Sequence, residues 1–185
     1  AKVLLFAGFV VSCCVLSGCR QPEQPLRIGI DDWPVYRLMK LAEDKGFFRD
    51  EGVDVRLLEF NSYADSRRAY DSRRIDGMGS TAIEVLITRD QSGRNTRIVR
   101  VLNFSEGADV IVAGKDVRSM RDLRGKRIGV ELDTFGMYVL ARALELEGMS
   151  LQDVTPVSTG QGSMVAHLLK GVIDAAVTCP PASTR

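Results

Sequence analysis

Hydrophobic and polar positions follow two alternating patterns along the chain, short extended runs and longer helical stretches. The first extended run is residues 26–30 (LRIGI). After it, apolar residues recur every three or four positions, at Val35, Leu38, Met39 and Ala42. This spacing places them on one face of a helix, which Gly46 is expected to end. Asp32 is expected to cap the start of that helix, with Pro34 in its first turn.

The same alternation continues to the end of the chain. Strands are expected over residues 53–60, 76–79, 97–104, 109–114, 126–131, 153–157 and 173–178. Helices are expected over residues 62–75, 80–86, 119–123, 135–147 and 161–170. Strands separated by helices of this kind indicate an α/β fold with parallel sheets flanked by helices. The two extended runs that meet at Ser105-Glu106-Gly107 predict a crossover between two lobes.

The composition is that of a globular chain without a strongly charged partner. Of 185 residues, 45% are hydrophobic and 26% are charged, unlike a disordered segment. Lys and Arg number 25 against 24 Asp and Glu, so no basic field exists to attract nucleic acid. Charges of both signs alternate in the expected helix over 62–75 and beside it, which predicts a solvated helix face: Arg67, Arg68, Arg73, Arg74, Asp65, Asp71 and Asp76.

The first 18 residues read as a secretory signal peptide. They contain a lysine and an apolar run that is shorter than the roughly 20 residues of a bilayer span. Residues 16–19 (LSGC) resemble the bacterial lipobox, in which the cysteine becomes the lipidated first residue. The sequence therefore predicts lipidation of Cys19, a linker over 19–25 and an extracytoplasmic, membrane-anchored protein. The alternative is a buried helix or short anchor with an incidental cysteine.

Cysteine and histidine usage argues against disulfides, metals and cofactors. After cleavage before Cys19 the chain keeps only Cys19 and Cys179, and the first would carry lipid. His167 is the single histidine, and no Cys or His cluster has metal-ligand spacing. We therefore expect no metal site and no cofactor.

Several segments carry a resemblance to one family. They are residues 27–55, residues 75–81 (IDGMGST), residues 103–114 (NFSEGADVIVAG), residues 122–131 (DLRGKRIGVE) and residues 171–178 (GVIDAAVT). In this order and wording the chain resembles the periplasmic solute-binding proteins of ABC importers, in the nitrate, sulfonate and taurine branch. The segments KGFFRDEGVDV and DLRGKRIGVE are the most specific in combination.

The resemblance implies a two-lobed periplasmic-binding-protein fold of type II, with solute held between the lobes. The first lobe is expected over 26–107, the second over 108–178, and the start of a return crossover over 179–185. Members of this family usually run longer and return to complete the first lobe. The resemblance therefore implies that the first lobe is incomplete here and that the sequence is C-terminally truncated.

Four strand ends are followed by polar or aromatic residues, and these make the predicted binding site. Ligands in open α/β sheets bind beyond the carboxyl ends of strands. Two of these ends also start helices, whose first N–H groups lack partners within the helix and favour negative charge. For Thr134 the alternative is a cap without ligand contact, and for Phe135 a place in the core. The predicted ligand-binding residues are Asp32, Trp33, Ser80, Thr81, Ser105, Glu106, Thr134, Phe135 and Gly136.

The predicted function is capture without catalysis. We expect the protein to hold a small anionic or zwitterionic solute, such as nitrate, a sulfonate or taurine, and to deliver it to an ABC permease and its ATPase. Because Asp32 and Glu106 would also suit an amine, a thiamine precursor stays open as the solute. Two alternatives remain, an enzyme on the same fold that resembles thiamine-pyrimidine synthases, and the sensory lobe of a signalling protein.

Overall fold

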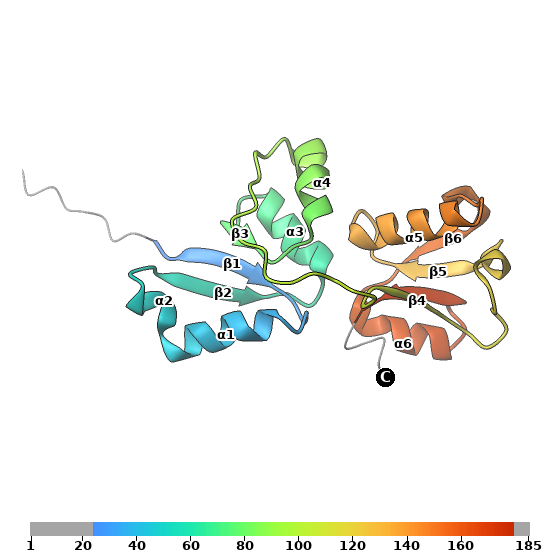
Figure 1. The fold of residues 1–185 in the computed structure, drawn as a ribbon, viewed down its shortest axis with the longest axis horizontal. Coiled ribbons are helices and arrows are strands. Elements are labelled where there is room, and N and C mark those ends of the chain that lie inside the picture. Colours follow the sequence, from blue (N-terminus) through green and yellow to red (C-terminus); the bar gives the residue numbers. More distant parts are fainter. Residues whose placement is uncertain (1–23, 180–185) are drawn as a thin grey trace, which may run out of the picture.

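The computed structural model of the protein describes residues 24–179, which form two α/β units joined by one extended segment (Figure 1). The predicted signal peptide, Cys19 with its predicted lipidation, and residues 180–185 of the predicted return crossover lie outside the described residues. Among the described helices, none has both the length and the apolar character that a membrane span requires.

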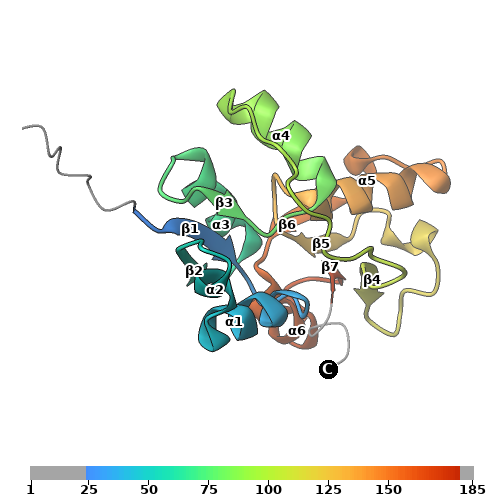
Figure 2. The same cartoon turned by 60° about the vertical axis from the view of Figure 1, so that its left-hand side comes forward.

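The first unit is built on a parallel sheet of three strands. Strand β1 (Leu26–Ile30) lies in the middle, between β2 (Val55–Glu59) and β3 (Gly77–Met78). The helices of this unit are α1 (Tyr36–Lys45), α2 (Phe47–Asp50), α3 (Tyr63–Asp71) and α4 (Ala82–Ser92). Helix α1 lies on one face of the sheet and α3 on the other (Figures 1 and 2).

The second unit is built on a four-stranded sheet in the order β4-β7-β5-β6. Its strands are β4 (Val110–Ala113), β5 (Arg127–Val130), β6 (Thr155–Ser158) and β7 (Ala175–Thr178). Its helices are α5 (Phe135–Leu146) and α6 (Gln161–Leu169), with the short 3₁₀ helices η1 (Met120–Leu123) and η2 (Leu151–Asp153). Helices α5 and α6 lie on opposite faces of this sheet (Figure 1).

Each unit buries its own hydrophobic cores. In the second unit the largest cluster joins strands to helix α5 through fully buried side chains, among them Ile128, Val130, Leu140 and Leu144. In the first unit one cluster lies under α1, around Ile30 and Tyr36, and another lies under α3, around Ile75. The fold-class prediction, an α/β fold of parallel-rich sheets flanked by helices, is confirmed.

An arginine at the start of β1 and another at the start of β5 make the same contact. Arg27 donates to Asp76 from its backbone N–H at 2.9 Å and from its guanidinium at 3.0 Å, twice. Arg127 binds Asp174 in the same way, at 2.9, 3.1 and 2.9 Å. Because each aspartate immediately precedes the neighbouring parallel strand, these bidentate pairs help to set the strand register.

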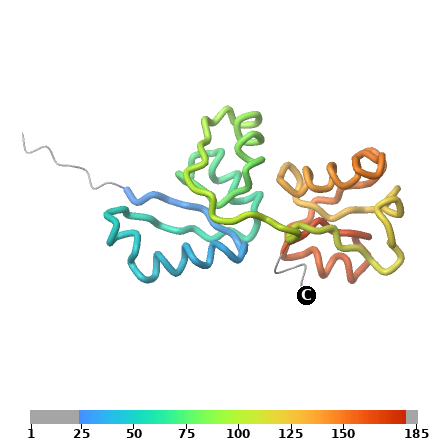
Figure 3. The backbone as a smooth tube through the Cα atoms, in the orientation of Figure 1, coloured from blue at the N-terminus to red at the C-terminus, as the bar shows by residue number. Residues whose placement is uncertain are grey.

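The expected strand over residues 97–104 is wrong. Residues 93–108 form the extended segment between the units, and among the described residues they pair with no strand (Figure 3). Val99 is 95% exposed and Phe104 87%. Apolar and β-branched residues favour a strand only where a neighbouring strand satisfies their backbone groups. The local pattern therefore predicted a strand that the structure does not contain.

Two further expectations about the elements need correction. Helix α1 starts at Tyr36 rather than beside Asp32, and its N-cap is Val35, so Asp32 does not cap it. Gly46 ends this helix as expected, with φ of 80°. The second sheet is not wholly parallel, because β4 pairs with β7 in the antiparallel direction. Such an edge strand on an otherwise parallel sheet is common in α/β folds.

Candidate functional site

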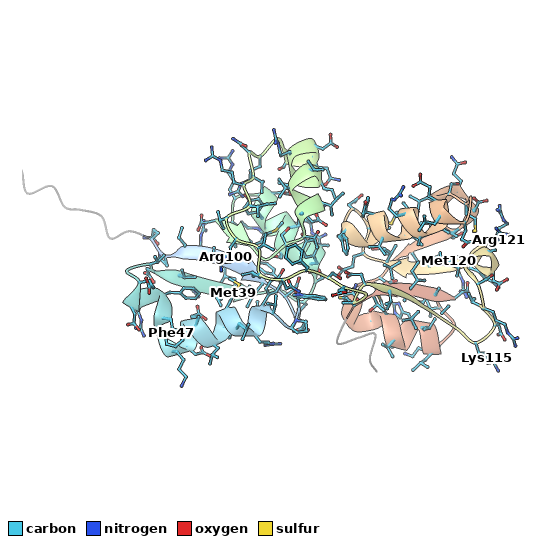
Figure 4. The ribbon with its side chains drawn as sticks, in the orientation of Figure 1. Met39, Phe47, Arg100, Lys115, Met120 and Arg121 are labelled. Carbon is cyan, nitrogen blue, oxygen red and sulfur yellow. The ribbon has the colours of Figure 1, made fainter. Side chains whose placement is uncertain are left out.

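The two units meet where the residues beyond their strand ends come together. The backbone N–H of Phe135, at the start of α5, donates to Glu84 Oε1 of α4 over 2.6 Å. We call this region the junction and define it as Asp31, Ser80–Glu84, Glu131–Gly136 and Cys179. Figure 4 shows Phe47 at the far end of the first unit and Lys115 and Arg121 at the far end of the second, all away from the junction.

The start of helix α5 already holds a carboxylate. Besides the Phe135 N–H, which binds Glu84, the N–H of Gly136 donates to Thr134 Oγ1 at 3.2 Å and that of Met137 to the Thr134 carbonyl at 3.0 Å. The N–H groups expected to face a solute are therefore already paired within the protein. Thr134 is 3% exposed and acts as the N-cap of the helix. Its hydroxyl also donates to the Glu131 carbonyl at 2.7 Å.

Glu84 is fully buried and is supported by an arginine from helix α3. The Arg67 Nε lies 3.8 Å from Glu84 Oε2, and Arg67 NH1 lies 3.6 Å from an oxygen of Asp71. Arg67 is only 6% exposed, so the interpretation of this arginine as part of a solvated face is wrong. Burial raises the pKa of Glu84 to about 7, although the Phe135 N–H and Arg67 oppose that rise.

The start of helix α6 is occupied by a second buried carboxylate, that of Glu131, which comes directly after strand β5. Glu131 is 7% exposed, and its carboxylate lies near the Gln161 N–H, which opposes the rise in its pKa. Burial and, to a smaller extent, the charges of Asp31, Asp65 and Glu84 together raise its pKa to about 7. Helices α5 and α6 thus both direct their N-terminal ends at carboxylates of the protein itself.

The start of helix α4 differs from those two. Its N-cap residue Thr81 makes no side-chain cap bond, and Thr81 Oγ1 is buried without a hydrogen-bond partner within residues 24–179. The neighbouring Ser80 Oγ lies 2.8 Å from the Tyr63 hydroxyl, and the Thr81 backbone lies near the same hydroxyl. Burial raises the pKa of Tyr63, and the charge of Glu84 adds to the rise. Hydroxyl groups therefore surround the start of α4.

The end of strand β1 brings Asp31 to the junction, whereas Asp32 lies outside it. Asp31 Oδ1 accepts from the Trp33 N–H at 2.9 Å, and burial raises the pKa of Asp31. Asp32 is exposed and binds Arg37 at 3.0 Å. Trp33 is partly buried and packs against the cluster around Ile30 and Tyr36. Trp33 therefore adjoins the junction while also belonging to the core of the first unit.

Ser105 and Glu106 lie on the extended segment that joins the units. Ser105 contacts Asp109 through its hydroxyl, and Glu106 is exposed. The charge of Asp109 reaches Cys179 at the end of β7, where burial raises the thiol pKa to about 12 and the charges of Asp109, Asp31 and Glu131 add to that rise. Ser105 is thus linked to the junction through Asp109.

The junction contains the predicted residues Ser80, Thr81, Thr134, Phe135 and Gly136, and it also contains three acids that the sequence reasoning missed. These acids are Asp31, Glu84 and Glu131. Asp31 and Glu131 each come directly after a strand, so the carboxyl-end rule alone would have found them. Glu84 lies inside a helix, and its role depends on contact between the units.

Two surface hollows lie outside the junction. They have volumes of about 310 and 400 Å³ and are lined by residues near the amino ends of β1 and β2, Asp54 and Val55 in the first and Leu26 and Arg27 in the second. Across residues 24–179, no group of three or more His, Cys, Asp or Glu side chains is arranged to hold a metal ion.

A model of one protein family matches most of the chain. The family described as NMT1/THI5 like matches residues 33–180. Among curated relatives, a 4-amino-5-hydroxymethyl-2-methylpyrimidine phosphate synthase of Aspergillus parasiticus is 30% identical, over 78% of this chain and 42% of its own length. A binding protein of Brucella abortus is 29% identical, over 82% of this chain and 47% of its own length. The chain thus spans less than half the length of these relatives.

Solved structures share the fold. The periplasmic aliphatic sulphonate binding protein SsuA from Escherichia coli matches with a TM-score of 0.68 and 23% identity, over 87% of this chain and 56% of that one. The alkanesulfonate-binding SsuA from Xanthomonas axonopodis pv. citri, bound to MOPS, matches with a TM-score of 0.67 and 19% identity, over 86% and 56%. At these identities the likeness concerns the fold, which is that of periplasmic binding proteins.

Proposed function

The chain belongs to the NMT1/THI5-like family, and on this premise we propose that it captures a small solute outside the cytoplasm and passes it to an ABC permease and ATPase. Its fold is that of periplasmic binding proteins, and relatives in Brucella are described as binding proteins. The fold is compatible with capture, and the description of the Brucella relatives favours capture over catalysis. Lipidation of Cys19 and the division into lobes over 26–107 and 108–178 are parts of the same proposal.

The solute in this proposal is small and carries an anionic group. The supporting observation is the start of α4, where Thr81 Oγ1 is buried and, among the described residues, unpartnered. A helix start attracts negative charge, and a buried hydroxyl is costly to leave without a partner. The starts of α5 and α6 are occupied by Glu84 and Glu131, so the α4 start with Ser80 and Thr81 is the favoured place for the anion.

The test compares two threonines at helix starts. Titration calorimetry would measure binding of sulfonates, nitrate and taurine to the protein and to Thr81→Ala and Thr134→Ala. Losing one hydroxyl hydrogen bond should cost Thr81→Ala about 0.5–1.5 kcal/mol of binding free energy. Thr134→Ala should instead lose about 1 kcal/mol of folding stability, because that hydroxyl caps α5.

Three results would count against the proposed site. They are unchanged affinity in Thr81→Ala, a larger affinity loss in Thr134→Ala than in Thr81→Ala, and no binding of any of these solutes. In the first two cases, binding at Thr134, Phe135 and Gly136 would become the better explanation, with the solute displacing Glu84.

A second candidate function rests on the relatives that are named as synthases. The Aspergillus parasiticus protein and Saccharomyces cerevisiae proteins of the same description match 74–78% of the chain. If the protein made 4-amino-5-hydroxymethyl-2-methylpyrimidine phosphate, its expression should restore growth to a strain that lacks this compound. Failure to restore growth, together with reversible solute binding, would favour the binding protein.

A further inference from the structure

Glu131 is a buried carboxylate with one oxygen left free. The side chain is 7% exposed, and Oε1 has no hydrogen-bond partner in the part of the chain that the structure describes. The carboxylate meets the Gln161 N–H at the start of α6. A Cβ atom at Gly160 would stand 3.8 Å from Oε1, in ordinary van der Waals contact with it. A buried carboxylate oxygen without a donor is costly, so its partner needs to be identified.

The groups around Glu131 make the junction negative. Asp31, Asp65 and Glu84 all act on Glu131 by charge repulsion, and Asp31 and Glu131 act in the same way on Cys179. Asp31 also acts on the buried Tyr36, and Glu84 on Tyr63. Arg67 is buried beside the junction, but its charge is shared between Glu84 and Asp71. The free oxygen of Glu131 therefore faces an excess of negative charge.

We infer that Glu131 and Asp31 form a subsite for an ammonium group of the solute. This inference rests on the proposed function, and it specifies the solute as a zwitterion or amine rather than a simple anion. An ammonium group supplies the missing donor to Oε1 and offsets the repulsion among the acids.

A metal ion is a weaker explanation for the same acids. Within residues 24–179 no three ligating side chains are arranged around one point, whereas divalent cations need several oxygen ligands together. An ammonium group carries three N–H donors and no acceptor, so it can pair with carboxylate oxygens without a full ligand set. The raised pKa of Glu131 agrees with a carboxylate that lacks its cation in the free protein.

The test compares solutes that differ only at the ammonium group. Taurine and isethionate are both two-carbon sulfonates, but the first ends in an ammonium and the second in a hydroxyl, and ethanolamine has the ammonium without the sulfonate. Titration calorimetry should find taurine bound at least about tenfold more tightly than isethionate, the value of one charge-assisted hydrogen bond. Glu131→Gln should weaken taurine by about tenfold and leave isethionate within about twofold.

Two further variants keep the test sharp. Asp31→Asn retains the oxygen that accepts the Trp33 N–H, so it should keep the fold and still weaken taurine. Glu145→Gln removes a carboxylate that is 65% exposed and paired with Arg142 far from the junction, so it should bind like the wild type. Thermal melts confirm that each variant is folded before its affinity is compared.

The outcomes separate this inference from the proposed function. If isethionate binds as tightly as taurine, or if Glu131→Gln keeps the full preference for taurine, the ammonium subsite is refuted while anion capture survives. If ethanolamine alone binds and depends on Glu131, the ammonium subsite stands and the anion site at α4 fails. If none of the three solutes binds, the proposed function fails for this solute class and the inference fails with it.

Discussion

The two units begin with the same short sequence pattern, and they differ only beyond it. Strand β1 reads Arg-Ile-Gly-Ile and is followed by Asp31, while β5 reads Arg-Ile-Gly-Val and is followed by Glu131. In both units the arginine binds the aspartate of a later Ile-Asp pair, Asp76 or Asp174, next to the neighbouring parallel strand. A matching local pattern thus delivers one acid from each unit to the junction.

The units differ a few residues beyond the aspartate of this pattern. In the first unit the residue three beyond Asp76 is Gly79, and in the second the residue three beyond Asp174 is Val177. A Cβ at Gly79 would stand 2.3 Å from Tyr36 Cζ, so only glycine lets this ring pack there. The second unit fills the corresponding place with a buried valine. The first unit therefore has a tyrosine at its strand ends, where the second has aliphatic core.

The largest expected loss of folding stability comes from replacing Gly79, the glycine that lets the first unit hold Tyr36 at its strand ends. Gly79→Ala forces a methyl group into the ring of Tyr36, with three ring or hydroxyl atoms within 2.7 Å. Overpacking of this kind costs about 1–3 kcal/mol, and we expect the upper end because the ring is buried and rigid. Chemical denaturation would measure the loss. Gly162→Ala is the control, because a Cβ there meets nothing within 4 Å and stability should be unchanged or slightly higher.

A stable Gly79→Ala protein would mean that Tyr36 can leave its place without cost. The contrast between Gly79 and Val177 would then not explain why the two units differ at their strand ends.

The second prediction concerns how the folding stability changes with pH through Glu131 and Glu84, the two acids of the junction with pKa values of about 7. Glu131 and Glu84 have pKa values of about 7 in the folded protein against 4.5 ordinarily, so the folded state binds these protons more tightly. The folded, solute-free protein is therefore favoured below pH 4.5, and this contribution is lost as pH rises through 7. Glu131→Gln should remove a decline on the order of 2 kcal/mol over this range.

Denaturation at several pH values between about 4.5 and 8 would measure how steeply the free energy of unfolding changes with pH in each protein. A steeper decline in Glu131→Gln than in the wild type would contradict the assignment. Glu145→Gln, at an exposed site, should keep the slope of the wild type.

The smallest effect tests whether the two arginine pairs are equivalent. Each arginine holds the pKa of its aspartate at about 2, first through side-chain and then through backbone hydrogen bonds. Arg27→Gln and Arg127→Gln should each return one pKa, that of Asp76 or Asp174, toward its ordinary value and leave the other unchanged. NMR titration of the carboxyl groups would show this. A joint shift of both pKa values would show that the pairs are coupled rather than independent copies.

Local patterns in the sequence predicted most of the helices and strands. Helical spacing and the stop at Gly46 predicted α1, and the apolar run before Glu131 predicted β5. The start of α5 was predicted at Phe135 and is found there, because the Thr134 cap is encoded locally. The rule that ligands bind beyond strand ends indicated Ser80 and Thr81, whose role as ligand contacts stays a prediction.

Where the local sequence pattern and the tertiary contacts disagreed, the tertiary contacts determined the structure. The run over 97–104 has strand-like residues but, in the described chain, no strand beside it, so it stays extended and exposed. Arg67 lies in a charged, polar stretch, yet α4 packs against α3 and buries it beside Glu84. No local pattern reports such partners, because they come from residues far away in the sequence.

Residues a few positions apart were enough to predict most of the strands and helices, the Thr134 cap of α5 and the family, although not the cap of α1 or the extended segment over 97–104. The tertiary structure alone decided what the start of α5 meets, which is Glu84 from the other unit, 51 positions away. It also decided that Asp31, Glu84 and Glu131 share one junction. The physical reason is that burial and charge repulsion act through space, so the ionisation of these acids depends on how the two units pack.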